Sequence, residues 1–299
     1  MNLKELGSTG VQVSELALGT WMYHGESEPL RAGIERGAFF IDTAESYGSE
    51  PIVGAAIRGI RDRVFLASKV SPRHFRYPDL IRAAECSLKE LNTDYLDLYQ
   101  LHWPNYTVDI AETMSAMERL VDMGRIRFIG VSNFSVAELQ RAQAKLSKYR
   151  IMSNQVRYSL LDRLPESGML TYCEANRISL LAYSPLGTGF DGLRAADTGD
   201  VLGEVSAEVG KTRAQVALNW CLVPSPVIAI FKSENTEHIL ENCGASGWRL
   251  TEAQHRRVSQ GVTAYRRRSR PEQVVRRLAR RALQYAGRSL GLPTAADRF

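Results

Sequence analysis

The sequence contains few cysteines, and they are not arranged to build a metal site or a disulfide framework. Of its 299 residues, four are cysteines, Cys86, Cys173, Cys221 and Cys243, and none of them forms a CxxC pair. No histidine lies at a ligand-like spacing from any of these thiols. We therefore expect neither a structural zinc site nor a disulfide-stapled scaffold.

The chain also lacks a long apolar run. No stretch approaches the ~20 apolar residues needed to cross a bilayer as a helix. Residues 1–8 have neither the basic start nor the apolar stretch of a signal peptide. These two absences predict a cytoplasmic protein.

A glycine-rich dinucleotide fingerprint is missing as well. No GxGxxG follows the first apolar run of strand length, at residues 16–20. That motif shapes the phosphate-binding turn of doubly wound α/β sheets. A doubly wound sheet is the main alternative for a chain of this length, and dinucleotide binding through such a turn has no support in the sequence.

The sequence does contain a regular alternation of apolar runs with amphipathic segments of helix length. Its composition, 44% hydrophobic and 24% charged, is that of an ordinary globular protein. Alternating strands and helices predict a parallel sheet, and nearly continuous apolar runs indicate strands buried on both faces. The expected strands are residues 16–20, 39–43, 64–69, 95–102, 127–132, 151–156, 179–184 and 227–231.

Eight such strands in one domain predict an α/β fold of the (β/α)8 TIM-barrel type. A β-hairpin with Gly7 and Gly10 in its turn is expected to precede the first barrel strand. Pro78 with Asp79, and Ser135 with Glu138, have the spacing of helix starts. We expect residues 1–263 to form the barrel.

The net charge of +5 is concentrated in the last part of the chain. Residues 264–299 contain ten arginines against two acids, a net charge of +8, so residues 1–263 carry −3. No nucleic-acid partner is expected for a slightly acidic barrel. Capping-box spacing and an apolar stripe predict a basic C-terminal helical extension. It can pack on the barrel, contact an anionic surface or partner, or fold over the barrel mouth as a lid.

Four polar residues with complementary chemistry fall at the ends of the second, third and fourth predicted strands. They are Asp42, Tyr47, Lys69 and His102. In a parallel barrel the strand ends meet at one face, so these side chains are expected to share one site. A lysine ammonium would lower the pKa of a nearby phenol, and Asp42 would hold that lysine. His102 would bind a substrate oxygen while the phenol protonates it.

These residues, together with the segments LKELGSTGVQVSELALGTW, GVSNF, NQVRYSLLD, AYSPLG and FKSENTEHILEN, resemble the aldo-keto reductase family. The resemblance covers about residues 2–262. It implies a catalytic tetrad of Asp42, Tyr47, Lys69 and His102, and reduction of an aldehyde, ketone or sugar by hydride transfer from a nicotinamide cofactor. Tyr47 is then the proton donor. A cofactor-sensing, partner-binding subunit of the same family, and a non-redox barrel such as an isomerase or lyase, are the alternatives.

The resemblance also implies a set of cofactor contacts at the strand ends. Asp42 again belongs to this set, near the nicotinamide ribose, and Tyr183 matches the aromatic residue on which the ring stacks. The expected contacts along the first seven strands are Gly19, Thr20, Asp42, Ser132, Asn133, Gln155, Tyr183, Ser184, Pro185, Leu186 and Gly187. The contacts after the last strand are Phe231, Lys232, Ser233, His238, Glu241 and Asn242.

The last of these segments bears on the choice between the two nicotinamide cofactors. In the family pattern a Lys-Ser pair and an arginine six residues after the lysine bind the adenosine 2′-phosphate. This chain keeps Lys232 and Ser233 but has His238 at the arginine position. A histidine lacks the permanent charge and bidentate geometry of arginine. The sequence predicts NADP(H) as the preferred cofactor and NAD(H) as an additional one.

The substrate pocket is expected on the loops after the first, third and fourth strands, where aromatic residues and histidines gather. An aromatic lining suits small apolar or aromatic carbonyl compounds and can also stack on a sugar. The predicted pocket residues are Trp21, Tyr23, His74, Phe75 and Trp103.

Overall fold

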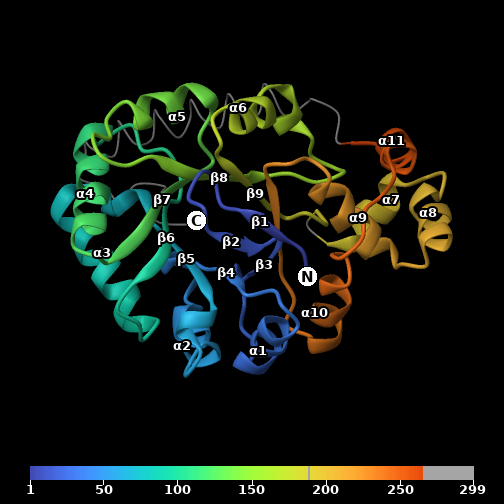
Figure 1. Cartoon of the computed structure of the whole chain (residues 1–299), viewed down its shortest axis with the longest axis horizontal. Coiled ribbons are helices and arrows are strands. Elements are labelled where there is room, and N and C mark those ends of the chain that lie inside the picture. The colour runs from blue at the N-terminus through green and yellow to red at the C-terminus, as the bar shows by residue number, and fades with distance from the viewer. Residues whose placement is uncertain (188, 265–299) are drawn as a thin grey trace, which may run out of the picture.

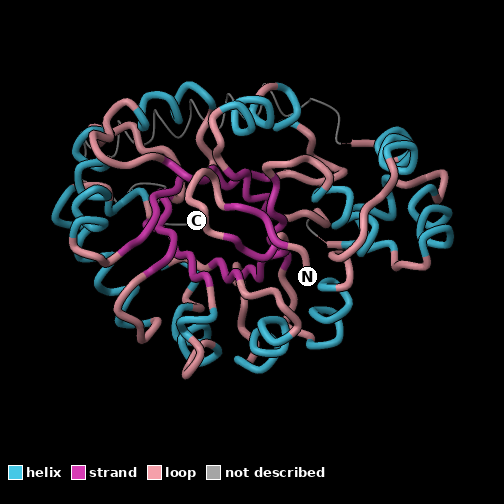
Figure 2. Tube along the Cα trace, viewed as in Figure 1, coloured by secondary structure: helices cyan, strands magenta, loops and turns pink. Residues whose placement is uncertain are grey.

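The computed structural model describes residues 1–187 and 189–264. Eight parallel strands form a closed barrel in the order β10-β3-β4-β5-β6-β7-β8-β9. The strands surround the centre as a ring, and the helices lie outside them (Figures 1 and 2). The predicted (β/α)8 barrel is confirmed, since each strand lies within its expected range or within one residue of it. The strands are β3 (Leu16–Gly19), β4 (Phe40–Asp42), β5 (Phe65–Val70), β6 (Leu96–Leu101), β7 (Ile126–Ser132), β8 (Ile151–Arg157), β9 (Ser179–Tyr183) and β10 (Val227–Phe231).

The predicted hairpin is also confirmed. Strands β1 (Leu3–Glu5) and β2 (Gln12–Ser14) pair antiparallel, and they lie across the barrel opening in Figure 1. Leu6 and Val13 are fully buried and pack with the interior residues at the start of the barrel strands, such as Phe40 and Phe65. The hairpin therefore closes the amino-terminal end of the barrel with apolar side chains.

The covering helices begin at residues whose side chains cap them. Helix α5 starts with a capping box in which Ser135 and Glu138 bond each other's backbone N–H groups, as predicted. Helix α3 has proline in its first turn, again as predicted. The helices up to the seventh barrel strand are α1 (Ser27–Glu35), α2 (Glu50–Ala56), α3 (Tyr77–Glu90), α4 (Ile110–Asp122), α5 (Val136–Gln143) and α6 (Met169–Ala175).

The connection between β9 and β10 is longer than a single crossover helix. It contains α7 (Phe190–Ala196), α8 (Val201–Val209) and α9 (Arg213–Leu222), and α10 (Thr236–Cys243) and α11 (Glu252–Gly261) follow β10. Short 3-10 turns η1 (Glu45–Tyr47), η2 (Arg61–Arg63), η3 (Pro72–His74) and η4 (Leu164–Ser167) lie in the loops. No helix in residues 1–187 or 189–264 is long and apolar enough to cross a membrane.

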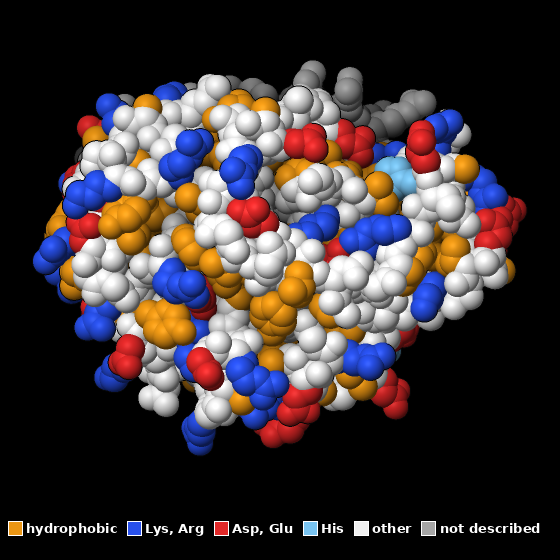
Figure 3. Space-filling model, in the orientation of Figure 1, with side chains coloured by type: hydrophobic (Ala, Val, Ile, Leu, Met, Phe, Trp, Pro, Cys, Tyr) orange, Lys and Arg blue, Asp and Glu red, His pale blue; other side chains and the backbone are white. Residues whose placement is uncertain are grey.

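Charged side chains of both signs lie on the face of the barrel that carries the hairpin. On the hairpin side, Lys and Arg residues alternate with Asp and Glu without a large patch of one sign (Figure 3). This matches the small net charge expected for residues 1–263. Beyond Ala264, the predicted basic helical extension lies outside the described residues, and so do its three possible roles.

The inward-facing residues of β4 and β5 are apolar at the closed end of the barrel and charged at the open end. Every second residue of a strand points to the same face. On β5 this series runs Phe65, Ala67 and Lys69, and the first two belong to the interior cluster. On β4 the series runs from Phe40 to Asp42. Both charged residues are therefore the inward-facing residues at the carboxyl ends of their strands.

Candidate active site

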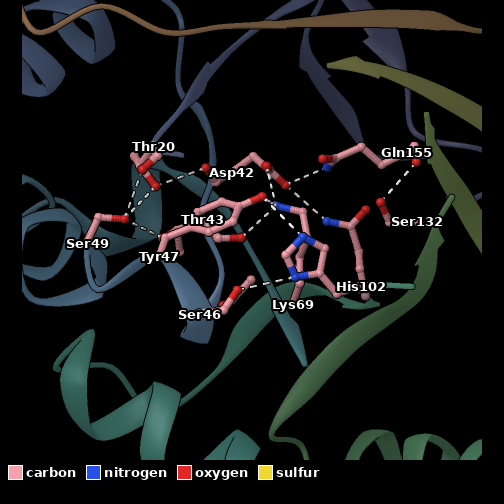
Figure 4. Close-up of polar contacts among 12 residues, drawn as sticks. Thr20, Asp42, Thr43, Ser46, Tyr47, Ser49, Lys69, His102, Ser132 and Gln155 are labelled. Atoms are coloured by element: carbon pink, nitrogen blue, oxygen red, sulfur yellow. Dashed lines mark hydrogen bonds and ion pairs between the residues drawn. The ribbon is translucent and has the colours of Figure 1, made fainter. Parts of the chain in front are cut away.

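The four residues expected to act together lie together at this end of the barrel (Figure 4). Lys69 Nζ donates to Asp42 Oδ2 at 2.6 Å and lies 3.2 Å from the Tyr47 hydroxyl. The Tyr47 hydroxyl lies 3.4 Å from His102 Nε2. The backbone carbonyl of Thr43 accepts a further hydrogen bond from Lys69 at 2.8 Å. Three separate segments, the ends of β4, β5 and β6 with the loops that follow, thus bring an acid, a phenol, an amine and an imidazole within contact.

Burial sets the electrostatics of the ion pair. The Lys69 side chain is fully buried and Asp42 is 2% exposed. Burial alone would lower the pKa of Lys69, but the Asp42 carboxylate and Tyr47 raise it above its usual value. The lysine is therefore a fixed positive charge beside the phenol.

The pKa of the Tyr47 phenol differs from the expectation of the sequence analysis. Burial raises the pKa of Tyr47 above its usual value; Lys69 acts in the opposite direction without outweighing it, and Asp42 adds to the rise. Lys69 lowers the pKa as predicted, but its effect is smaller than that of burial, so the expectation of an acidic phenol is wrong for the chain alone. The consequence is that Tyr47 carries its proton throughout the neutral pH range, and Lys69 stands ready to stabilise the phenolate once that proton leaves.

His102 is a neutral imidazole in this site. Burial, with a smaller effect of the Lys69 charge, lowers the pKa of His102 to about 3. Its Nδ1 lies 3.5 Å from the Ser46 hydroxyl, which leaves Nε2 facing Tyr47. A neutral ring can donate a hydrogen bond to a substrate oxygen without competing with Tyr47 as the acid.

Because His102 is neutral in the folded chain, the free energy of unfolding is expected to depend on pH. Unfolding exposes His102 to water and restores a pKa near 6.5. The native chain then binds fewer protons than the unfolded chain below that pH, so the free energy of unfolding falls as the pH drops from ~6.5 towards 3. The expected loss from this one residue is about 2 kcal/mol between pH 7 and pH 5.

Urea unfolding at both pH values measures this loss. His102→Gln should lose less stability on acidification than the unmodified chain. Equal losses in the two proteins would contradict a buried neutral imidazole.

Two glutamines orient the Asp42 carboxylate of the ion pair. Gln100 and Gln155 each donate from Nε2 to Asp42 Oδ1, at 3.0 and 2.8 Å. With Lys69 on Oδ2, both oxygens of Asp42 are occupied. The sequence analysis missed Gln100, although a signal was present: it lies two residues before His102 in an apolar strand, hence on the same inward face.

Hydroxyl groups link the loops that follow β3 and β4, close to Tyr47. Ser49 Oγ donates to Thr20 Oγ1 at 2.9 Å and lies 3.2 Å from Thr43 Oγ1. Thr20 in turn donates to the Asp42 carbonyl at 3.3 Å. This chain of contacts, also drawn in Figure 4, fixes the segment that carries Tyr47 relative to strand β3.

Three of the predicted cofactor residues, Ser132, Asn133 and Gln155, form a connected group with Tyr183 at the ends of β7, β8 and β9. Asn133 Nδ2 donates to the His102 carbonyl at 3.1 Å and to Ser132 Oγ at 3.0 Å, and Asn133 Oδ1 accepts from the Tyr183 hydroxyl at 3.0 Å. Ser132 Oγ donates to the Gln155 carbonyl at 3.0 Å. With these contacts made, Asn133 Oδ1 keeps one lone pair, and Gln155 Nε2, which gives one N–H to Asp42, keeps a second N–H, so an acceptor and a donor remain for a planar amide. This donor set fits a nicotinamide carboxamide.

Two residues of the predicted cofactor set have unusual backbone conformations. Asn133 and Ser184 have φ values of +63° and +52°, in the left-handed region. Residues other than glycine seldom occupy this region, and those that do often lie at functional sites. Gly187, with φ +77°, ends the segment Ser184–Gly187 whose Pro185 is buried and whose Leu186 packs against the core.

The remaining predicted cofactor residues lie at the starts and ends of β3, β10 and α10. Gly19 pairs with Asp42 across β3 and β4, and an added Cβ at Gly19 would approach Ile230 Cγ2 to 2.7 Å. Phe231 is 2% exposed, Asn242 is 7% exposed and Glu241 is half-buried. His238 is exposed in the first turn of α10, where Asn235 caps the helix. Lys232 and Ser233 lie just before that helix, at the same end of the barrel as Asp42.

The structure corrects the predicted substrate pocket at two of its five residues. Tyr23 and Phe75 are each 1% exposed and belong to the hydrophobic core between strands and helices. Their aromatic rings are buried because the apolar core lies directly beneath the loops that carry them. Trp21 is 59% exposed, and Trp103 is half-buried.

The predicted pocket residue His74 has a partner that the sequence did not reveal. His74 Nδ1 lies 3.1 Å from both carboxylate oxygens of Glu45, and Glu45 also accepts from the backbone N–H of Ser71. Glu45 stands two residues before Tyr47, and Ser71 two residues after Lys69. This contact fastens the turn that carries the phenol to the strand end that carries the amine.

These features together define a (β/α)8 barrel with a cluster of polar, titratable side chains at the carboxyl ends of its strands. The family model described as the Aldo/keto reductase family matches residues 15–262. The chain therefore belongs to this family, and the resemblance seen in the sequence is confirmed. It is an NAD(P)H-dependent oxidoreductase acting on carbonyl groups.

Individual relatives agree with this assignment. The chain is 37% identical over 258 residues to methylglyoxal reductase YeaE of Escherichia coli, covering 83% of this chain and 90% of that protein. It is 35% identical over 249 residues to glyoxal reductase of Bacillus subtilis, with coverages of 81% and 87%. A solved aldo-keto reductase from Klebsiella pneumoniae in complex with NADP and acetate has a TM-score of 0.81 at 37% identity, covering 89% of this chain and 96% of that one.

Proposed function

We propose that this chain reduces a small aldehyde, ketone or sugar to the alcohol, with Tyr47 as proton donor and NADP(H) as the preferred cofactor. The observation that carries the proposal is the position of one phenol, 3.2 Å from a buried ammonium and 3.4 Å from a neutral imidazole. A bound nicotinamide dinucleotide would supply the hydride that goes to the carbonyl carbon.

The residues of the chain supply the proton and hold its partners in place. Tyr47 gives its hydroxyl proton to the carbonyl oxygen as that oxygen gains negative charge. The phenolate left behind is stabilised by the Lys69 ammonium, which Asp42 and the Thr43 carbonyl hold from the other side. His102 donates a hydrogen bond to the same substrate oxygen. Pre-placed charges of this kind need no reorganisation during the reaction.

Dicarbonyl compounds are the first substrates to test. Two of the relatives bear the names methylglyoxal reductase and glyoxal reductase. In this chain residues 102–109 alone connect β6 to α4, so the loop beside His102 is short. With Tyr23 and Phe75 buried, the aromatic lining reduces to Trp21 and Trp103. A site with so little aromatic lining suits small, polar carbonyl compounds better than large apolar ones.

A panel of carbonyl compounds tests the proposal. We expect the purified chain to oxidise NADPH in the presence of small aldehydes, including methylglyoxal and glyoxal, and to oxidise NADH more slowly. Tight cofactor binding with no turnover of any aldehyde, ketone or sugar would favour the cofactor-sensing alternative. The absence of nicotinamide binding would favour a non-redox barrel.

His238→Arg tests the cofactor preference. An arginine at this position can form two charge-assisted hydrogen bonds to a phosphate, which a histidine cannot. The expected result is a roughly tenfold rise in kcat/KM for NADPH, the size of one additional charged hydrogen bond. The value for NADH should stay within about twofold, since NADH lacks the phosphate. An equal rise for both cofactors would show that residue 238 does not act through the 2′-phosphate.

A further inference from the structure

The lysine expected to bind the 2′-phosphate already has an anionic partner within the chain. Lys232 Nζ donates to Glu234 Oε1 at 2.7 Å, and both side chains are little more than a third exposed. The Lys232 contact, followed by the bond from the His24 N–H, lowers the pKa of Glu234 below its usual value, so the carboxylate is charged at neutral pH. A phosphate that binds Lys232 must therefore compete with this carboxylate.

Glu234 is held in this position by the neighbouring loop. Its Oε1 also accepts from the backbone N–H of His24 at 3.2 Å. Gly25 follows, and a Cβ there would lie 3.1 Å from Glu234 Cγ, so backbone and side chain approach closely. The carboxylate is thus fixed on the β10–α10 loop and on the β3–α1 loop at once, rather than moving freely in solvent.

The surroundings of Lys232 are acidic. Lys232 Nζ lies 5.9 Å from the centre of the Tyr23 ring. Burial raises the pKa of Tyr23 to about 12, and the negative charges of Glu234, Glu28 and Glu26 add to that rise. Three carboxylates therefore act on the Tyr23 ring, which borders the region around Lys232. A phosphate dianion entering it meets repulsion, whereas a neutral hydroxyl does not.

We propose that Glu234 is a cofactor-selectivity residue that competes with the adenosine 2′-phosphate for Lys232 and accepts a hydrogen bond from the 2′-hydroxyl of NAD(H). The inference rests on the proposed function and extends it. NADP(H) must displace the Glu234 carboxylate from Lys232, while NAD(H) leaves that pair intact and gains an acceptor. Together with the imidazole at His238, this contact makes the chain a reductase that uses both cofactors.

Direct binding measurements test the inference without any turnover. Dissociation constants for NADP⁺ and NAD⁺ are measured by isothermal titration calorimetry on the unmodified chain, on Glu234→Gln and on Glu237→Gln. The amide oxygen that replaces the carboxylate in Glu234→Gln can still accept from the His24 N–H, so the loop contact is kept and only the charge is lost. Glu237 is an exposed acid in the first turn of α10. It is the matched control, because its removal changes the net charge equally.

The expected result is a change of selectivity in one variant only. Glu234→Gln should bind NADP⁺ about fivefold more tightly, the size of one partly exposed ion pair, and NAD⁺ no more tightly than before. Glu237→Gln should change the NADP⁺-to-NAD⁺ ratio by less than about twofold. If both nucleotides bind and Glu234→Gln leaves the ratio unchanged, or shifts it no more than Glu237→Gln does, the inference is wrong while the proposed function stands. If neither nucleotide binds the unmodified chain, both are wrong.

Discussion

Tyr47→Phe is expected to lower kcat for carbonyl reduction by a factor of about 10³ while leaving cofactor binding within about twofold. The substitution removes one oxygen and keeps the ring, its edge-to-face contact with His102 and its position over Lys69. Lys69 and His102 carry protons but lie behind or beside the phenol, so neither replaces it as the donor. A residual rate remains, because the placement of substrate and charge is unchanged.

Steady-state turnover and cofactor titration measure the two parts of this prediction separately. Tyr149→Phe is the matched control: it also removes a phenolic oxygen, from a hydrogen bond with Asp122 far from the site. Its kcat should equal that of the unmodified chain. If Tyr47→Phe kept more than about a tenth of the original kcat, another group would be the proton donor and the proposed mechanism would have to be abandoned.

Asp42→Ala is expected to destabilise the fold by about 3–5 kcal/mol and to abolish turnover. The substitution leaves the fully buried Lys69 ammonium without its carboxylate and deprives the Gln100 and Gln155 amides of their acceptor. A buried charge without a partner costs far more than an exposed one. Without Asp42, Lys69 no longer holds the Tyr47 hydroxyl in place or stabilises its phenolate.

Urea unfolding of Asp42→Ala and of three further variants separates the effect of the ion pair from general effects of substitution. Lys69→Met should cost a similar amount, and the double variant Asp42→Ala with Lys69→Met should cost less than the sum of the two single changes, because no charge is left unpaired. Glu35→Ala, which removes an exposed i,i+4 partner of Arg31, should cost less than about 0.5 kcal/mol. Additive costs for Asp42 and Lys69 would contradict a coupled buried pair.

The barrel strands and the four central site residues are predictable from sequence for a simple physical reason. Parallel strands buried on both faces need nearly continuous apolar runs, so an acid or amine at the end of such a run, like Asp42 or Lys69, is conspicuous. Closure of the barrel then brings the strand ends to one face. No further information is needed to expect these side chains in one site.

Other features depend on three-dimensional contacts that a linear pattern does not contain. Tyr23 and Phe75 look like pocket residues because aromatic rings occur in loops, but whether a ring points outward or into the core depends on the packing beneath it. Burial raises the pKa of Tyr47 and Lys69 lowers it, and which effect is larger depends on how deeply the phenol is buried. The pairing of Lys232 with Glu234, and the bond from the β3–α1 loop to Glu234, are likewise visible only in the folded chain.

The central claim, that this chain transfers hydride from a nicotinamide cofactor to a carbonyl carbon, is tested most directly by isotope transfer. The purified chain would be incubated with methylglyoxal and NADPH carrying deuterium at its transferable position, and the product would be analysed by mass spectrometry and proton NMR. The account predicts one deuterium on the new alcohol carbon for each NADPH oxidised. A product without deuterium, or conversion of the substrate without oxidation of NADPH, would contradict it.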